Sequence, residues 1–142
     1  MGRGEKLEVL KGVPGEHKCV FMKEWNSPES LSREETLGIL LNSWFVPCPG
    51  GQNAETFRIY EALEAGAIPV FVKDETIEPL IGQLARRLPL LVAENWGQAA
   101  AIIHTLKNGQ PEQYDMIRGQ VLNAWVAWKE DIRATVRKIF RV

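Results

Sequence analysis

The sequence has few of the residues that build metal centres or disulfide frameworks. It contains two cysteines and two histidines in 142 residues. Cys19 and Cys48 lack the spacing of a zinc site or a CxxC motif, and neither His17 nor His104 lies near a second plausible ligand. We therefore expect no metal site and two small buried cysteines in or beside strands. Whether Cys19 and Cys48 form a disulfide depends on a Cα separation that the sequence does not contain.

Long hydrophobic runs are also missing. Nowhere do roughly 18 consecutive apolar residues occur, as a membrane-spanning helix requires, and residues 1–17 lack the apolar core of a signal peptide. We therefore expect a soluble chain, cytoplasmic as given. The net charge of -1 is uninformative, but the lack of a long basic stretch with interleaved aromatics argues against nucleic-acid binding. The length predicts one domain at residues 18–142, after a lead-in segment at residues 1–17.

Strand-forming and helix-forming segments alternate along the chain. Apolar runs rich in strand formers predict strands at residues 18–25, 43–48, 67–72 and 88–93, and amphipathic segments predict helices near residues 32–42, 55–65, 77–87 and 95–109. The run AIPVFV at residues 67–72 is apolar throughout, which is typical of a strand covered on both faces. This alternation predicts an α/β fold of three layers, with a parallel sheet and right-handed crossovers.

Three local signals mark the ends of these helices. Ser32 and Glu35 have the spacing of a capping box, and Asn95 followed by Gln98 predicts another helix start. Gly66 lies where a helix end needs a residue that tolerates positive φ.

The last segment predicts one long helix beginning at Pro111. Its apolar residues recur at steps of three and four: Ile117, Val121, Trp125, Trp128, Ile132, Val136 and Ile139. A helix of about 28 residues would be about 42 Å long, comparable with the diameter of the whole domain. Two interpretations stay open. The stripe packs entirely on this domain, or part of it packs against something that this chain lacks. Gly119 is the expected weak point if the helix kinks.

The segment CPGGQNAETFRIYEALEAGAIPVFV, residues 48–72, has the features of an anion site. Gly50 and Gly51 allow a close backbone approach to a ligand, and the helix that follows presents free amides and the positive end of its dipole. Thr56 adds a hydroxyl and Arg58 a guanidinium that can contact two phosphate oxygens. Glu61, one turn further along, can accept hydrogen bonds from ribose hydroxyls.

A purely structural interpretation competes with this one. Glu55, Arg58 and Glu61 follow one another at i, i+3 spacing, which surface helices use for weak salt bridges. The segment also lacks a Walker lysine and the GxGxxG spacing. Spacing alone therefore favours the salt-bridge interpretation.

The same segment resembles the donor-site segment of exostosin-type glycosyltransferases, and it is especially similar to their ribitol-phosphate xylosyltransferase group. In that family a strand ending in Cys-Pro leads through a glycine loop into a Ser/Thr-Phe-Arg-x-Tyr-Glu-Ala helix and then Gly-x-Ile-Pro-Val. Weaker similarity in LLNSWFVPCPGG, LPLLVAENWGQAAAII and WVAWKEDIRATV extends the match over roughly residues 18–140. The resemblance reverses the preference for a salt bridge.

The resemblance implies a GT-B architecture of two Rossmann-like halves, with this chain as the C-terminal, donor-binding half. The implied nucleotide-sugar contacts are Gly50, Gly51, Thr56 and Arg58 with the diphosphate, Glu61 with the ribose, and Asn53 with donor hydroxyls. Asn53 stands where many related enzymes have an acidic residue, so it offers no charge. The implied donor is a UDP-sugar, with no cofactor or metal. The general base would come from an acceptor-binding half or second polypeptide, and relatives of this kind are commonly lumenal Golgi enzymes.

Two alternatives remain. The chain could be a stand-alone module that binds a nucleotide at this site or a protein partner through Trp125 and Trp128. A receiver-type signalling domain fits the alternation of strands and helices equally well. Such a domain needs a cluster of acidic residues at successive strand ends, and this sequence offers only Asp74 with the adjacent Glu75.

Overall fold

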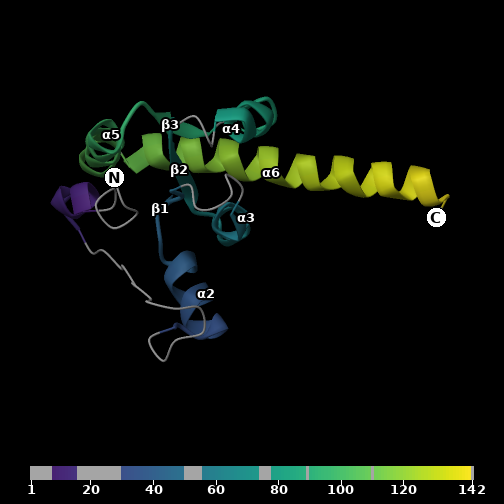
Figure 1. Cartoon of the computed structure of the whole chain (residues 1–142), viewed down its shortest axis with the longest axis horizontal. Helices are drawn as coiled ribbons and strands as arrows, with labels where there is room; N and C mark the ends of the chain where they lie inside the picture. Colours follow the sequence, from purple (N-terminus) through teal and green to yellow (C-terminus); the bar gives the residue numbers. More distant parts are fainter. Residues whose placement is uncertain are drawn as a thin grey trace.

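In the part of the chain that the structure describes, three parallel strands form the sheet of this α/β protein (Figure 1). The structure is a computed structural model that describes residues 8–15, 30–49, 56–73, 78–88, 90–109 and 111–141. Strands β1 (Phe45–Pro47), β2 (Ile68–Val72) and β3 (Leu91–Ala93) lie in the order β1-β2-β3. Phe45 is opposite Ile68 in the register, and Val70 is opposite Leu91. The predicted strand at residues 18–25 lies outside the described residues.

The helices alternate with these strands as predicted, although most elements are shorter than expected. Their bounds are α2 (Arg33–Leu41), α3 (Phe57–Ala65), α4 (Glu78–Ala85), α5 (Trp96–Asn108) and α6 (Pro111–Phe140), with a 3-10 turn η1 (Val9–Gly12) before them. The start expected for the last strand, at residue 88, was wrong. The Leu88 amide donates to the Leu84 carbonyl at 2.8 Å, so Leu88 closes the turn that ends α4.

The sheet is covered on both faces because successive residues of each strand point to opposite sides. Val46 and Phe71 pack with α3 and α4, whose inward side chains include Ile59, Leu63 and Leu84. The other face is covered by η1 with its C-cap and by α5, which pack on Val70 and Ala93 of the strands through Leu10, Val13, Trp96, Ala99 and Ile103. The three-layer prediction is confirmed by these two clusters. The described part of the lead-in segment contributes to the second cluster, and the boundary at residue 18 stays a prediction.

The three predicted helix ends are present in the structure. Ser32 and Glu35 form a reciprocal capping box at the start of α2, and the Asn95 side chain accepts from the Gln98 amide at 2.9 Å. Gly66 ends α3 with φ of 75°, in the left-handed region that favours glycine. Short-range hydrogen-bond chemistry therefore determines where these helices begin and end.

Helix α6 runs without interruption from Pro111 to Phe140 and extends well beyond the rest of the molecule (Figure 1). Its first half packs on the domain through Tyr114, Val121 and Trp125, all of them buried. Of the two interpretations of the apolar stripe, the one in which it packs entirely on this domain was wrong, because Ile132, Val136 and Ile139 are exposed. The face of Trp125 and Trp128 is used at least in part within the domain, since Trp125 is part of the core and the half-buried Trp128 packs against it. Its use by a protein partner stays a prediction.

Candidate functional site

The candidate site lies where β1 ends and α3 begins, at the carboxyl edge of the sheet. Cys48 follows β1 and remains tied to the sheet, because its amide donates to the Val70 carbonyl at 2.9 Å. Thr56 is the N-cap of α3 and has an extended backbone. Its hydroxyl makes no capping hydrogen bond to the helix, so this hydroxyl is available at the end where helix amides are open. Gly50, Gly51 and Asn53 lie outside the described residues.

Arg58 and Glu61 form an ion pair on the first turns of α3. Arg58 Nη1 lies 3.0 Å from Glu61 Oε2, and the two side chains are 44% and 45% exposed. The salt bridge that the spacing predicts is therefore present. It engages one nitrogen of a guanidinium that has five N–H donors, so the remaining donors can still contact a phosphate. At this exposure the pair itself stabilises the fold by only about 0.2–1 kcal/mol.

The Cys48 thiol, directly after β1, shares the electrostatic environment of this pair. The thiol is a buried free cysteine and donates a hydrogen bond to the Val46 carbonyl at 3.4 Å. Burial raises the pKa of the Cys48 thiol to about 12, while Arg58 lowers it and Glu61 raises it by smaller amounts. Cys48 is thus a protonated packing residue at neutral pH, as expected from the sequence. Cys19 lies outside the described residues, so the question of a disulfide with it stays open.

Phe57 is a feature of this site that the sequence analysis did not single out. It is the first residue of α3 and is 84% exposed, far more than an aromatic side chain usually is. A signal was present in the sequence. Phe57 lies on the opposite side of the helix from the buried Ile59 and Leu63, so its place on the polar side is not explained by packing. An exposed aromatic ring at a strand-to-helix junction can stack on a planar ligand group such as a base.

The neighbouring strand ends carry charge at the same edge of the sheet. Lys73 follows β2 and Glu94 follows β3, and their side chains form an ion pair. The Lys73 amide also donates to the Ala93 carbonyl at 2.9 Å. The carboxyl edge thus presents two cationic side chains, Arg58 and Lys73, each beside a carboxylate. Lys73 could not be predicted from single segments, because only the pairing of β2 with β3 brings it to Glu94.

Comparison with known proteins identifies the family. The family model described as the RXYLT1 C-terminal domain matches residues 2–141. The chain belongs to this family. It is also 26% identical over 148 aligned positions to ribitol-5-phosphate xylosyltransferase 1 of Mus musculus. That alignment covers 94% of this chain and 33% of the mouse protein, so the chain spans about a third of the length of its relative. No solved structure matches the chain.

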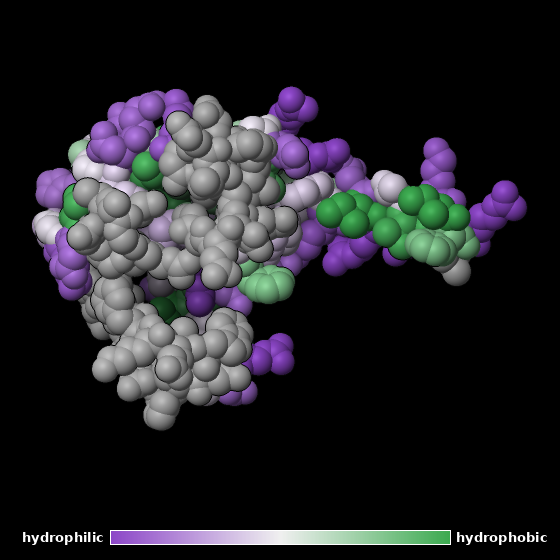
Figure 2. All heavy atoms as spheres, viewed as in Figure 1, coloured by the Kyte–Doolittle hydropathy of each residue, from purple (hydrophilic) through white to green (hydrophobic). Residues whose placement is uncertain are grey.

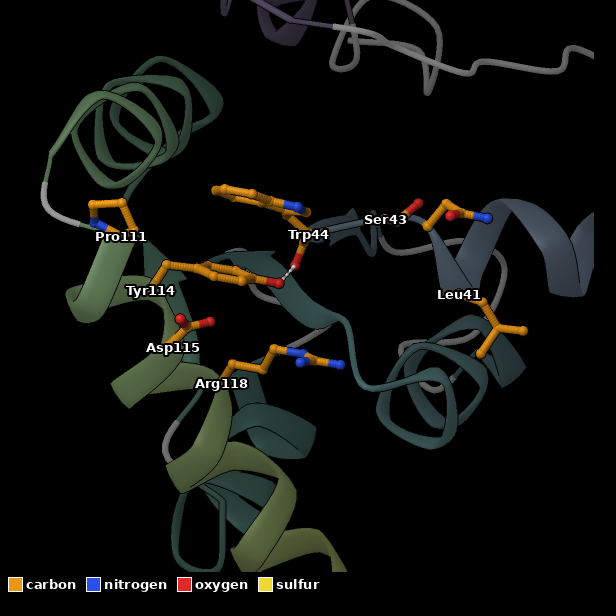
Figure 3. Close-up of a pocket in the computed structure, with 8 residues that line it drawn as sticks. Leu41, Ser43, Trp44, Pro111, Tyr114, Asp115 and Arg118 are labelled. Atoms are coloured by element: carbon orange, nitrogen blue, oxygen red, sulfur yellow. Dashed lines mark hydrogen bonds between the residues drawn. The ribbon is translucent and has the colours of Figure 1, made fainter.

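This RXYLT1-type domain has an open pocket of about 390 Å³ at the opposite, amino edge of the sheet (Figure 3). The pocket lies beside Trp44, just before β1, and the first turns of α6. The Tyr114 ring stacks on Trp44 at 4.4 Å, and its hydroxyl donates to the Trp44 carbonyl at 3.4 Å. Arg118 Nε donates to the Gly66 carbonyl at 2.7 Å. These groups join α6 to the sheet, and we interpret the pocket as part of that junction.

No cluster of three or more His, Cys, Asp or Glu side chains in the described ranges is arranged to hold a metal ion. Among the helices that the structure describes, none is both long and apolar enough to cross a membrane. The independence from metal that the resemblance implies stays a prediction.

Proposed function

We propose that this domain binds a nucleotide sugar, a UDP-sugar in our expectation, for transfer of its glycosyl group to an acceptor hydroxyl. The observation that carries the proposal is the group formed by Thr56, Arg58 and Glu61 on the first turns of α3. It lies at the carboxyl edge of a parallel sheet, where ligands bind in open α/β folds. Family membership and the name of the mouse relative support the same reaction class.

Different residues of the site would contact different parts of the nucleotide sugar. The open amides of α3, the Thr56 hydroxyl and the outer N–H groups of Arg58 would hold the diphosphate. Glu61, on the outward side of the next turn, would accept hydrogen bonds from the ribose. Gly50 and Gly51 would complete the diphosphate contact, and Asn53 would bond donor hydroxyls, as the family resemblance implies.

Fixed positive groups at the diphosphate would also assist the reaction. Charge accumulates on the departing diphosphate as the bond to the sugar breaks, and donors placed where this charge develops lower the barrier. Arg58 is suited to this role because its guanidinium stays charged at any working pH. A general base for the acceptor hydroxyl would come from an acceptor-binding half outside this domain. The domain alone would therefore bind the donor without turnover, and the architecture of the whole enzyme would be GT-B with this domain as its Rossmann-like donor half.

The test is a titration of the chain with UDP and several UDP-sugars, in which binding is measured by calorimetry and by changes in amide chemical shifts. We expect Arg58→Ala to weaken UDP binding about 10- to 100-fold, since a charge-assisted hydrogen bond contributes about 1.5–3 kcal/mol. Arg87→Ala is the matched control. Arg87 is an exposed arginine in an ion pair with Asp131, and it follows α4 at the opposite edge of the sheet. Equal effects of the two substitutions, or no binding at millimolar UDP, would overturn the proposal.

The alternative is a module that binds a nucleotide or a protein without belonging to an enzyme. The same titration tests this alternative, because a general nucleotide site would bind UDP and UDP-sugars with equal affinity. Preference for one UDP-sugar over UDP supports the donor-domain proposal.

A further inference from the structure

The pocket at the amino edge of the sheet combines an exposed aromatic ring with charged groups. Its volume of about 390 Å³ lies within the range of about 300–1,000 Å³ that is usual for small-molecule sites. Its walls are the end of α2, the residue before β1 and the first turns of α6 (Figure 3). Three segments of the chain thus surround one space, and a small ligand can be contacted from several sides.

The protruding end of α6 also exposes apolar side chains, as Figure 2 shows on the extended part of the molecule. They include Ile132, Val136 and Ile139. Nothing in the described part of the structure covers these side chains or indicates what would. The pocket differs from this end of α6, because its side chains come from several elements and carry charges of both signs.

Trp44 forms a rigid and exposed platform at the pocket. Its ring stacks on the buried ring of Tyr114, with 4.4 Å between the ring centroids and 18° between the ring planes. The Tyr114 hydroxyl also donates to the Trp44 carbonyl at 3.4 Å. Even so, Trp44 is 46% exposed, although tryptophan is highly buried on average. A ring that is already held in place loses little conformational entropy when a ligand packs on it.

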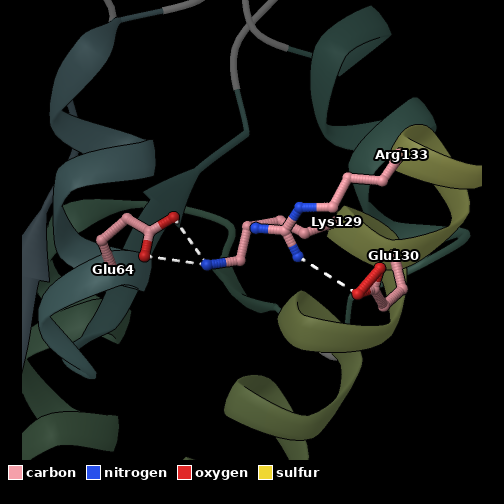
Figure 4. Close-up of polar contacts among 4 residues, drawn as sticks. All are labelled: Glu64, Lys129, Glu130 and Arg133. Carbon is pink, nitrogen blue, oxygen red and sulfur yellow. Dashed lines mark hydrogen bonds and ion pairs between the residues drawn. The ribbon is translucent and has the colours of Figure 1, made fainter. Parts of the chain in front are cut away.

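Asp115 and Arg118 have opposite charges at i, i+3 spacing on α6, yet they form no ion pair with each other. The same spacing later on α6 does produce an ion pair, between Glu130 and Arg133 at 3.4 Å (Figure 4). Arg118 Nε donates instead to the Gly66 carbonyl at 2.7 Å. The exposed Asp115 makes no ion pair with any residue that the structure describes. The pocket therefore has an open carboxylate, and on Arg118 it has N–H donors that the bond to Gly66 does not use.

The end of α2 adds hydrogen-bond acceptors on the other side of the pocket. Asn42 Nδ2 and Ser43 Oγ each donate to a carbonyl of the preceding turn of α2, at 2.8 Å and 2.7 Å. These bonds leave the Asn42 Oδ1 and the Ser43 lone pairs as acceptors. The exposed Leu41 gives this side an apolar edge. Figure 3 shows the Arg118 guanidinium directed toward the side on which Leu41 lies.

These groups fit a neutral sugar better than an ion. Asp115 would repel a phosphate or a carboxylate, and Arg118 would repel a cation. Each hydroxyl of a sugar can both donate and accept a hydrogen bond, so one sugar ring can bond to Asp115 and to Arg118. The apolar face of a pyranose ring can pack on the exposed part of Trp44, which removes apolar surface from water.

We propose that this pocket binds a pyranose unit of a carbohydrate, with Trp44 as the platform, Asp115 as an acceptor and Arg118 as a donor for its hydroxyls. The pocket lies at the opposite edge of the sheet from Thr56 and Arg58, so it is a second site. This inference goes beyond the proposed function and does not depend on it, because a sugar can bind here whether or not α3 binds UDP. In a glycosyltransferase, such a site retains a sugar chain at a distance from the reacting bond.

The experiment titrates the isotope-labelled chain with the methyl pyranosides of glucose, galactose and xylose. It follows the indole signal of Trp44 and the amide signals around Asp115. We expect at least one sugar to shift these signals with a Kd of about 1–10 mM, because an open pocket buries only part of its ligand. Trp44→Ala should weaken this binding at least about ten-fold, and Trp44→Phe should restore part of it. Asp115→Asn should weaken it about five-fold, since a neutral amide accepts a weaker hydrogen bond than a carboxylate does.

Asp131→Asn is the matched control, because it makes the same change at an exposed acid later on α6. The inference is overturned by any of four results: no shift with any of the three sugars at about 100 mM, equal effects of Asp115→Asn and Asp131→Asn, tighter binding of inorganic phosphate than of the sugars, or loss of the sugar shifts when UDP saturates the chain. If Trp44→Ala fails to fold, Asp115→Asn decides the question, because it preserves the shape of an exposed side chain. Asp115→Asn should leave UDP affinity unchanged, so failure of this inference can be distinguished from failure of the proposed function.

Discussion

Replacing Gly66 by alanine tests how the chain returns from α3 to the sheet. Gly66 has φ of 75°, and a Cβ atom at this position would lie 2.9 Å from Arg118 Nη2. The left-handed conformation costs a residue with a Cβ atom about 1–2 kcal/mol. Arg118 would also have to move, and it would then give up its 2.7 Å hydrogen bond to the Gly66 carbonyl, worth about 0.5–1.5 kcal/mol.

We therefore expect Gly66→Ala to lower the free energy of unfolding by about 2–3 kcal/mol, and to lower the Tm by about 6–10 °C for a chain of this size. Urea and thermal unfolding measure both quantities. In an Arg118→Met background the same substitution should cost only the conformational part, about 1–2 kcal/mol, because the hydrogen bond is already absent.

Glycines inside helices provide the control with the opposite sign. A Cβ atom at Gly38 in α2 or at Gly119 in α6 would meet nothing within 4 Å, and neither residue has positive φ. Gly38→Ala and Gly119→Ala should each stabilise the chain by about 0.5–1 kcal/mol. A Gly66→Ala chain whose Tm is unchanged, or is raised as in these two variants, would contradict this prediction.

Two further predictions concern the pH dependence of stability and the start of α2. Burial raises the pKa of Cys48 from 9.0 to about 12, so the protonated thiol stabilises the folded state below pH 9 and this contribution is lost as the pH rises from 9 towards 12. The difference in unfolding free energy between the wild-type chain and Cys48→Ala should therefore shrink by about 2 kcal/mol between pH 8 and pH 10.5, and a constant difference would contradict the assignment. Ser32→Ala removes the capping box of α2 and should cost about 1 kcal/mol, with faster amide hydrogen exchange in α2, whereas Ser32→Gly should cost only a few tenths of that. An unchanged stability of Ser32→Ala would show that the capping bond is not what holds this helix end.

At the candidate site, the local sequence predicts an ion pair but not whether that pair contacts a ligand. The i, i+3 spacing of Arg58 and Glu61 predicts the ion pair that the structure contains, because two residues three apart on a helix are always neighbours. The same spacing does not predict whether the pair also faces a ligand. That depends on which edge of the sheet the turn occupies, on the exposed Phe57 ring next to Arg58, and on Lys73, which reaches the same edge from the end of β2. The assignment of Arg58 to a diphosphate and Glu61 to a ribose remains a prediction of the family resemblance.

The sequence by itself determined the order of the elements and the ends of several helices. Capping by Ser32 and Asn95, and the positive φ of Gly66, depend on hydrogen bonds and steric contacts within a few residues, so they can be read from neighbouring letters. Only the tertiary structure decided what covers each apolar face. The stripe of α6 has the same period at Val121 and at Ile139, yet the first is buried and the second is exposed. Periodicity records which side of a helix is apolar, whereas burial depends on how far the neighbouring layers extend along it.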